Sequence, residues 1–237
     1  MLTRVLEPET LDHLAADDPA AQRARRDLRR VNAFMGARRI LARALARALP
    51  DDRPGLRILE IGCGDGRLLL EVAKHRGARW PAARVDLLDR QPIVDAATIA
   101  AYAAAGWQAR SVVADVLDWA EADGSERWDV VVANLFLHHF EGGALGRLLA
   151  GCARRADALV ACEPRRSRFA LAASHLIFFL GANAVTRRDG VLSVRAGFVG
   201  DELTQAWPMA GDAWRLDEYE DGAFTHCLCA VRRKPSV

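Results

Sequence analysis

The 237-residue sequence has little that would support a zinc site or a disulfide framework. It contains five cysteines, an odd number, and no two of them form a Cys-x-x-Cys pair or a Cys/His spacing typical of zinc ligands. Four of the five lie in apolar segments, where a free cysteine behaves as a small buried hydrophobic residue. We therefore expect reduced thiols, a cytoplasmic location and no bound metal.

The sequence also lacks a long hydrophobic run. Its first 13 residues contain no apolar stretch, so we expect no signal peptide. The most apolar segment, residues 169–185, contains Ser174, His175 and Asn183 and is shorter than the roughly 20 apolar residues of a membrane span. We expect a buried or lid helix there and no stable membrane insertion, while contact of this helix with a membrane surface stays open.

Lysine is nearly absent, since it occurs only at Lys74 and Lys234. The 33 basic and 31 acidic side chains nevertheless leave a formal net charge of only +2. Arginines are spread along the chain, apart from a local cluster from Arg23 to Arg30. A nucleic-acid-binding protein usually gathers a stronger basic excess on one face, so this distribution argues against a nucleic-acid partner.

What the sequence does contain is a change of pattern near residue 50. Over residues 22–49, apolar side chains recur at helical spacing, and Gly36 interrupts them, which predicts two helices or one bent helix. After a breaker cluster at 50–55, short apolar strands alternate with helical stretches. We expect strands at 56–61, 84–89, 108–114, 128–134, 157–163, 213–220 and 223–232, and helices at 67–77, 92–105 and 141–155.

This alternation predicts an α/β fold. Strands separated by helices form a parallel sheet, and right-handed crossovers place helices on both of its faces. The last two strands are joined by a short turn at Asp221-Gly222, so they must pair antiparallel. We expect a Rossmann-like, mostly parallel seven-stranded sheet over residues 51–237, an N-terminal helical cap over 1–50, and a substrate-covering insert at about 165–210.

A glycine-rich turn, EIGCGDG at residues 60–66, follows the first expected strand. Glycines there allow a sharp turn and a close approach of the backbone to a ligand. A dinucleotide-binding G-x-G-x-x-G motif would place its third glycine at position 67, which is Arg67. Glu60 and Asp65 would repel a pyrophosphate, whereas they would attract a ligand that carries a sulfonium and an ammonium group.

The segment LEIGCGDGRL at residues 59–68 resembles motif I of the class I S-adenosylmethionine-dependent methyltransferases, and the resemblance extends over about residues 56–163. It implies that S-adenosylmethionine is the cofactor, with Asp89 on the ribose hydroxyls, Asp115 at the adenine amino group and Asn134 beside the methionine moiety. The implied donor site consists of Glu60, Gly62, Cys63, Gly64, Asp89, Asp115, Val116 and Asn134. The glycines as a tight turn and the acids as strand-end caps remain the structural alternative.

Two adjacent histidines are candidates for catalysis. His138 and His139 lie in the stretch LFLHHF at residues 135–140, and an imidazole there could accept a proton from a phenol or hydroxyl as the methyl group arrives. Adjacent helical residues point about 100° apart, so at most one of the two faces a pocket. We favour His138 slightly, and the alternative that this stretch only begins a helix stays open.

Three further residues are candidates for ligand contact. Arg165 follows the fifth expected strand, at the edge where open α/β sheets bind ligands, and could bind an acidic substrate group or be solvated. His175 lies in the apolar insert and is a second substrate candidate. Arg38, in the helical region before the glycine-rich turn, is a candidate for the carboxylate of the donor.

The expected function is transfer of the methyl group of S-adenosylmethionine to an oxygen, or as second choice a carbon, of a small hydrophobic aromatic or polyketide-like metabolite. The apolar and aromatic insert favours such an acceptor. Three alternatives stay open: a non-catalytic partner protein that binds S-adenosylmethionine, an NAD-dependent oxidoreductase on a Rossmann-like sheet, and a nucleic-acid methyltransferase. The sequence does not indicate an oligomeric state.

Overall fold

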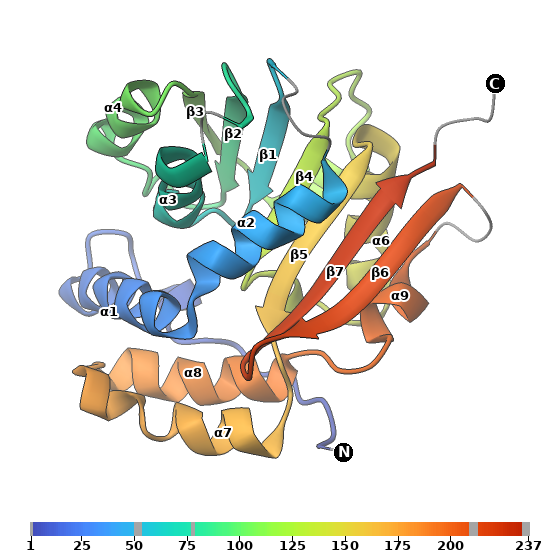
Figure 1. The fold of residues 1–237 in the computed structure, drawn as a ribbon. Helices are drawn as coiled ribbons and strands as arrows, with labels where there is room; N and C mark the ends of the chain where they lie inside the picture. Colours follow the sequence, from blue (N-terminus) through green and yellow to red (C-terminus); the bar gives the residue numbers. More distant parts are fainter. Residues whose placement is uncertain (1, 50–53, 77–78, 209–212, 234–237) are drawn as a thin grey trace.

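A seven-stranded sheet runs through the molecule in the order β3-β2-β1-β4-β5-β7-β6 (Figure 1). The computed structural model describes residues 2–49, 54–76, 79–208 and 213–233. The strands are β1 Arg57–Ile61, β2 Arg84–Asp89, β3 Gln108–Val113, β4 Val130–Asn134, β5 Ala158–Pro164, β6 Trp214–Asp221 and β7 Thr225–Arg232. Each expected strand lies within two residues of these bounds.

Strand directions confirm the predicted mixed sheet. β1 pairs in parallel with β2 on one side and with β4 on the other. β7 pairs antiparallel with both β5 and β6, so six strands run in one direction and β7 runs against them. The order in which strands are added to the sheet reverses between β1 and β4. Open α/β sheets bind ligands in the crevice at such a point, and the carboxyl ends of these two strands border it.

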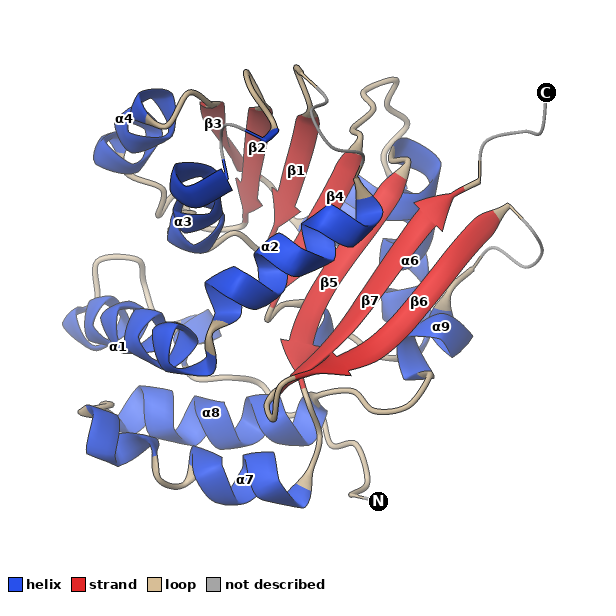
Figure 2. Ribbon diagram, viewed as in Figure 1, coloured by secondary structure: helices blue, strands red, loops and turns tan. Residues whose placement is uncertain are grey.

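Helices cover both faces of the sheet (Figure 2). The helices are α1 Pro19–Met35, α2 Ala37–Ala48, α3 Arg67–Arg76, α4 Ala96–Ala104, α5 Val116–Glu121, α6 Gly142–Arg155, α7 Arg168–Ser174, α8 Ala184–Ala196 and α9 Glu202–Ala206, with short 3-10 helices η1 Leu11–His13, η3 Leu137–His139 and η4 Ile177–Leu180. One core cluster joins α2, α3 and α4 to the sheet, and a second joins α5, α6 and α9 to its other face.

Gly36 separates the two N-terminal helices, as the sequence predicts. It ends α1 with a φ of 72°, a left-handed conformation that glycine adopts without a steric penalty. Ile40, Leu41 and Leu45 of α2 are buried in the core cluster against the sheet. Within residues 1–50, α2 therefore belongs to the helical layer of the sheet, and α1 with the segment before it lies outside that layer.

The apolar insert does not form the single helix that we expect over residues 169–185. It forms α7, η4 and the start of α8 instead. The Ser167 side chain caps α7, and the Asn183 side chain accepts a hydrogen bond from the Thr186 N–H to begin α8, so two separate helix starts divide the segment. Among the described residues, no helix has the length and apolarity needed to cross a membrane.

Close packing of α5 on α6 predicts an opposite response of two glycines in α6. A Cβ atom at Gly151 would lie 2.6 Å from the Ala120 Cβ and 2.8 Å from its carbonyl oxygen, so Gly151→Ala should lower the free energy of unfolding by about 1–3 kcal/mol. Gly146 has open space around it, so Gly146→Ala should raise that free energy by about 0.5–1 kcal/mol. Urea denaturation of both variants checks this, and a shift in the same direction would contradict it.

Candidate active site

A cavity of about 1310 Å³ lies at the carboxyl ends of the central strands. Its floor comes from the glycine-rich turn and from the ends of β2 and β4, and η3 contributes one wall. Residues 6–13 of the N-terminal segment and the side of α1 that faces the sheet form the opposite wall. The cavity is therefore built from segments that are far apart in the sequence.

The predicted donor residues come together in this cavity. Each of them lines it, and so does Arg38 at the start of α2. Arg38 makes no ion pair with any described residue, so its charge is available to a ligand in the cavity. The residues brought together are Glu60, Gly62, Cys63, Gly64, Asp89, Asp115, Val116 and Asn134.

The conformation of the glycine-rich turn depends on Gly62 and Gly64, which have φ values of 61° and 56°. A Cβ atom at Gly62 would lie 2.0 Å from the ring of Phe136, so only glycine lets the aromatic wall of the cavity pack on this turn. The Gly64 N–H donates to Asp89 Oδ2 at 2.9 Å, and the Tyr102 hydroxyl donates to the Gly66 carbonyl oxygen at 2.8 Å. These bonds hold the turn against the end of β2 and α4.

Glu60 is a buried acid without a partner. Its side chain is 3% exposed, and its Oε2 atom accepts no hydrogen bond from the described residues. Burial and the nearby carboxylates of Asp65 and Asp89 raise the pKa of Glu60 to about 8. A buried ionised carboxylate without a compensating charge is costly, so this position favours a ligand that brings a positive charge or a hydrogen-bond donor.

Asp89 and Asp115 each combine a structural bond with exposure to the cavity. The Asp89 carboxylate accepts N–H bonds from Gly64 and Gln91, and burial raises its pKa. Asp115 caps α5 by accepting N–H bonds from Leu117 and Asp118, so the capping role considered from the sequence is part of its function. A carboxylate offers about four lone-pair sites, so both side chains retain acceptor capacity for a ligand.

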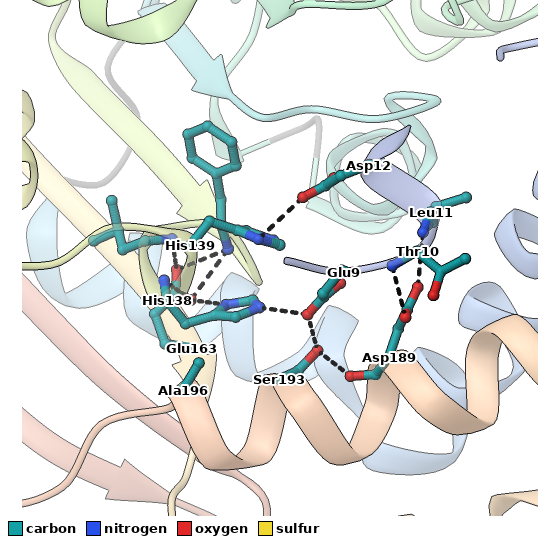
Figure 3. A network of polar contacts seen from close by, with 12 residues as sticks. Glu9, Thr10, Leu11, Asp12, His138, His139, Glu163, Asp189, Ser193 and Ala196 are labelled. Atoms are coloured by element: carbon teal, nitrogen blue, oxygen red, sulfur yellow. Dashed lines mark hydrogen bonds and ion pairs between the residues drawn. The ribbon is translucent and has the colours of Figure 1, made fainter. Parts of the chain in front are cut away.

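The position of the two histidines is set by Glu163 in β5 (Figure 3). This carboxylate has no exposed surface and accepts backbone N–H bonds from Phe136, Leu137 and His138. It also accepts a bond from His138 Nδ1 at 2.8 Å. Four donor groups on one buried carboxylate hold the turn after β4 in the 3-10 conformation of η3.

His138 does not line the cavity, so the geometry does not support our preference for it as the base. Its side chain is 2% exposed, and Nε2 lies 3.3 Å from Oε1 of Glu9, so carboxylates engage both ring nitrogens. Burial alone would lower the pKa of His138, but the hydrogen bonds to Glu163 and Glu9 outweigh it and raise the pKa to about 9. His138 is thus an imidazolium at neutral pH, without a free nitrogen to accept a proton.

His139 lines the cavity and has the opposite charge state. Burial and the neighbouring positive charge of His138 lower the pKa of His139, so its ring is neutral at pH 7. Nδ1 lies 3.3 Å from Oδ2 of Asp12 (Figure 3). When Nδ1–H donates to that carboxylate, Nε2 carries the free lone pair and can accept a proton.

Sequence reasoning missed Glu9 and Asp12. Both precede η3 by more than 120 residues, and no local pattern marks them. One potential metal-ligand atom from each of Glu9, His138 and His139 lies within 4.8 Å of the others, a spacing that a metal ion could bridge. Because both nitrogens of His138 already contact carboxylates, we assign this cluster to a hydrogen-bond network.

The structure does not bring Arg165 or His175 to the large cavity. Arg165 forms an ion pair with Glu220 of β6 at 2.6 Å, because its side chain turns toward the β6–β7 hairpin. His175 lines a second, smaller cavity that α8 also borders. The geometry therefore does not support a contact of either residue with a ligand bound at the glycine-rich turn.

Comparisons with known proteins agree with this geometry. Residues 32–169 match the family model described as a methyltransferase domain. The fold is similar to the plantazolicin methyltransferase BpumL in complex with SAH, with 14% identity, 92% of each chain covered and a TM-score of 0.60. It is also similar to the mitomycin 7-O-methyltransferase MmcR, with 18% identity, 94% of this chain and 60% of that chain covered and a TM-score of 0.58. A third similar structure is the magnesium protoporphyrin IX methyltransferase ChlM from Synechocystis PCC 6803 with bound SAH, with 19% identity, 88% of this chain and 86% of that chain covered and a TM-score of 0.53. No curated protein matches the sequence.

The raised pKa of His138 predicts a loss of stability in alkali. The folded-state pKa of about 9 exceeds the ordinary value of 6.5, so the contribution of His138 is fully present below pH 6.5 and is lost as the pH rises through about 9. We expect a loss on the order of 2–3 kcal/mol in the free energy of unfolding, measured by urea denaturation. Glu9→Gln should reduce this loss, whereas Glu7→Gln, which changes an exposed neighbour, should not. If the free energy of unfolding depends on pH in the same way in the wild type and in both variants, the raised pKa of His138 is contradicted.

Proposed function

The chain belongs to the methyltransferase-domain family, and on that premise we propose that it transfers the methyl group of S-adenosylmethionine to a hydroxyl oxygen of a small, largely apolar aromatic acceptor. The observation that carries this proposal is the neutral imidazole of His139. It faces the same cavity as the predicted donor residues, and Asp12 orients it. A base in this position suits removal of a hydroxyl proton.

The residues at the glycine-rich turn fit the donor. Glu60, whose pKa of about 8 would fall beside a positive charge, suits the sulfonium or ammonium group of S-adenosylmethionine, and the guanidinium of Arg38, which pairs with no described residue, suits its carboxylate. Asp89 would accept from the ribose hydroxyls and Asp115 from the adenine amino group, with Val116 against the ring. When bound, the donor supplies an electrophilic methyl group on a sulfonium, which is a good leaving group. The same carboxylates would repel a pyrophosphate, which argues against NAD.

The remainder of the cavity fits an apolar acceptor. Aromatic and aliphatic side chains line the part of the wall formed by the N-terminal segment, α1 and η3. These side chains are Leu6, Leu11, Leu28, Phe34, Phe136 and Phe140. Apolar walls with a few convergent polar groups are typical of small-molecule sites. The name of the mitomycin 7-O-methyltransferase, a protein of similar fold, is in keeping with an oxygen acceptor.

The two histidines have different roles: His139 accepts the proton, and His138 keeps His139 neutral before the reaction. With the donor bound, Nε2 of His139 would accept the hydroxyl proton of the acceptor, whose oxygen would take the methyl group that the donor supplies, and the donor would leave as S-adenosylhomocysteine. Asp12 stabilises the imidazolium that forms, through Nδ1–H. The positive ring of His138, whose centroid lies 4.3 Å from that of His139, keeps His139 neutral before the reaction. Alignment of oxygen, methyl carbon and sulfur supplies the rest of the rate enhancement.

Donor binding is tested by isothermal titration calorimetry with S-adenosylhomocysteine and, separately, with NAD. We expect binding of the first ligand alone. Asp89→Asn should weaken that binding by about 1.5–3 kcal/mol, because a charged acceptor for two hydroxyls is lost. Asp201→Asn, outside the cavity, serves as the matched control. Binding of NAD, or an Asp89→Asn affinity equal to that of the control, would contradict the donor assignment.

The role of His139 is tested with a panel of phenolic acceptors. The ratio kcat/KM should rise with pH through an apparent pKa below 6.5, because His139 must be neutral to accept a proton. His139→Gln should lower kcat by about 10²–10⁴ and remove this dependence while leaving the affinity for S-adenosylhomocysteine intact. Asp12→Asn should give a smaller loss, and His175→Gln none. Donor binding without turnover of any acceptor would instead favour a non-catalytic partner protein.

A further inference from the structure

Large apolar side chains are concentrated on the outer face of the insert. Phe169 of α7, Leu176, and Phe179 of η4 are 63%, 55% and 74% exposed. They are three of the six strongly exposed large hydrophobic residues in the described part of the chain, yet they lie within 11 residues of one another. Together with the exposed Ala172 they lie on three consecutive segments, α7, the turn after it and η4, and we call these four exposed residues the apolar stripe.

Arginine side chains lie on α8, which packs against α7. The cavity between α7 and α8 is lined by His175, Arg187, Arg188 and Arg195, and no acidic residue is among its described lining residues. Residues 165–196 contain six arginines, of which Arg165 and Arg166 form ion pairs with Glu220 and Glu202, and one acid, Asp189. That acid is buried and accepts the backbone N–H groups of Thr10 and Leu11, so it does not neutralise the outer face.

The inner face of the insert is firmly attached to the rest of the molecule. The Asn183 N–H donates to the buried Asp27 of α1, and the Asn183 side chain donates to the Ala20 carbonyl oxygen. The Ser193 hydroxyl of α8 donates to Glu9. These bonds attach α8 to α1 and to the N-terminal segment, and α7, which carries part of the apolar stripe, packs against α8 (Figure 1).

A row of aromatic rings joins the apolar stripe to the active-site cavity. The ring of Phe169 stacks on that of Phe224, in the β6–β7 turn, with centroids 5.6 Å apart. Phe224 in turn lies 6.5 Å from Phe34, and Phe34 lines the cavity. The apolar surface outside and the cavity inside are therefore continuous.

We propose that this face docks on the surface of an anionic lipid bilayer. The apolar stripe would lie in the boundary between headgroups and acyl chains, and the arginines would contact lipid phosphates, as in interfacial amphipathic segments. A second copy of this chain fits less well, because a two-fold interface would bring the same arginines of both copies together. If the proposed function holds, a lipophilic acceptor could pass from the bilayer along Phe169, Phe224 and Phe34 to the cavity.

Co-sedimentation of the full chain with vesicles tests this proposal. We expect binding to vesicles of equal parts phosphatidylcholine and phosphatidylglycerol, weaker binding to phosphatidylcholine alone, and release at high salt. The double variants Leu176→Ser/Phe179→Ser and Arg187→Gln/Arg188→Gln should each lower the partition coefficient on the order of tenfold. The change in the first should persist at high salt, because it removes apolar contact.

Matched controls separate docking from loss of fold and from loss of net charge. Val113→Ser changes an exposed apolar residue on β3, and Lys74→Gln/Arg84→Gln removes the same charge outside the insert, on α3 and at the start of β2. Both variants should bind vesicles as the wild type does. All variants should bind S-adenosylhomocysteine equally, which shows that they are folded. If the wild type does not bind it, the proposed function is overturned, but the vesicle experiment still tests the docking proposal independently. The docking proposal would be overturned if the wild type does not bind vesicles, or if the control variants lose as much vesicle binding as the test variants. It would also be overturned if the wild type is a dimer that does not bind vesicles and that Leu176→Ser/Phe179→Ser converts to a monomer.

Discussion

The bonds that compensate the buried carboxylate of Glu163 are the constraint on which the candidate active site depends. A charge in that position is tolerated only while it is hydrogen-bonded, and the donors are three consecutive backbone N–H groups and the ring of His138. To make these hydrogen bonds, the chain after β4 forms a 3-10 turn, and Leu135 adopts a positive φ of 51°. The turn thereby directs one histidine inward and the next one toward the cavity.

Opposite protonation states of two adjacent imidazoles follow from this arrangement. His138 lies between two carboxylates and carries a proton, and its charge helps to keep His139 neutral. The N-terminal segment completes both environments, since it supplies Glu9 to one ring and Asp12 to the other. Glu9 also accepts from Ser193 of the insert, so the same segment links the two histidines to the surface that we propose for lipid docking.

The sequence predicted most of what depends on neighbouring residues. Apolar runs predicted the strands and Gly36 predicted the helix break, because each signal is local. The residues predicted to bind the donor line one cavity, and their role in binding stays a prediction. The structure overturned the single helix over 169–185, since apolar composition does not reveal the caps that divide it. It also leads us to propose His139 as the base in place of His138, because the directions of the two rings depend on Glu163 and on the N-terminal segment, contacts between residues far apart in the chain.

The central claim, that a cationic His138 holds a neutral His139 ready as the base, is tested most directly by nitrogen-15 NMR of the histidine side chains across a pH titration. Assignment would use the His138→Gln and His139→Gln variants. The account predicts that His138 carries protons on both nitrogens at pH 7 and loses one only near pH 9, while His139 is neutral at pH 7 with its proton on Nδ1. Titration of both rings together near the ordinary value of 6.5, or a neutral His138 at pH 7, would contradict it.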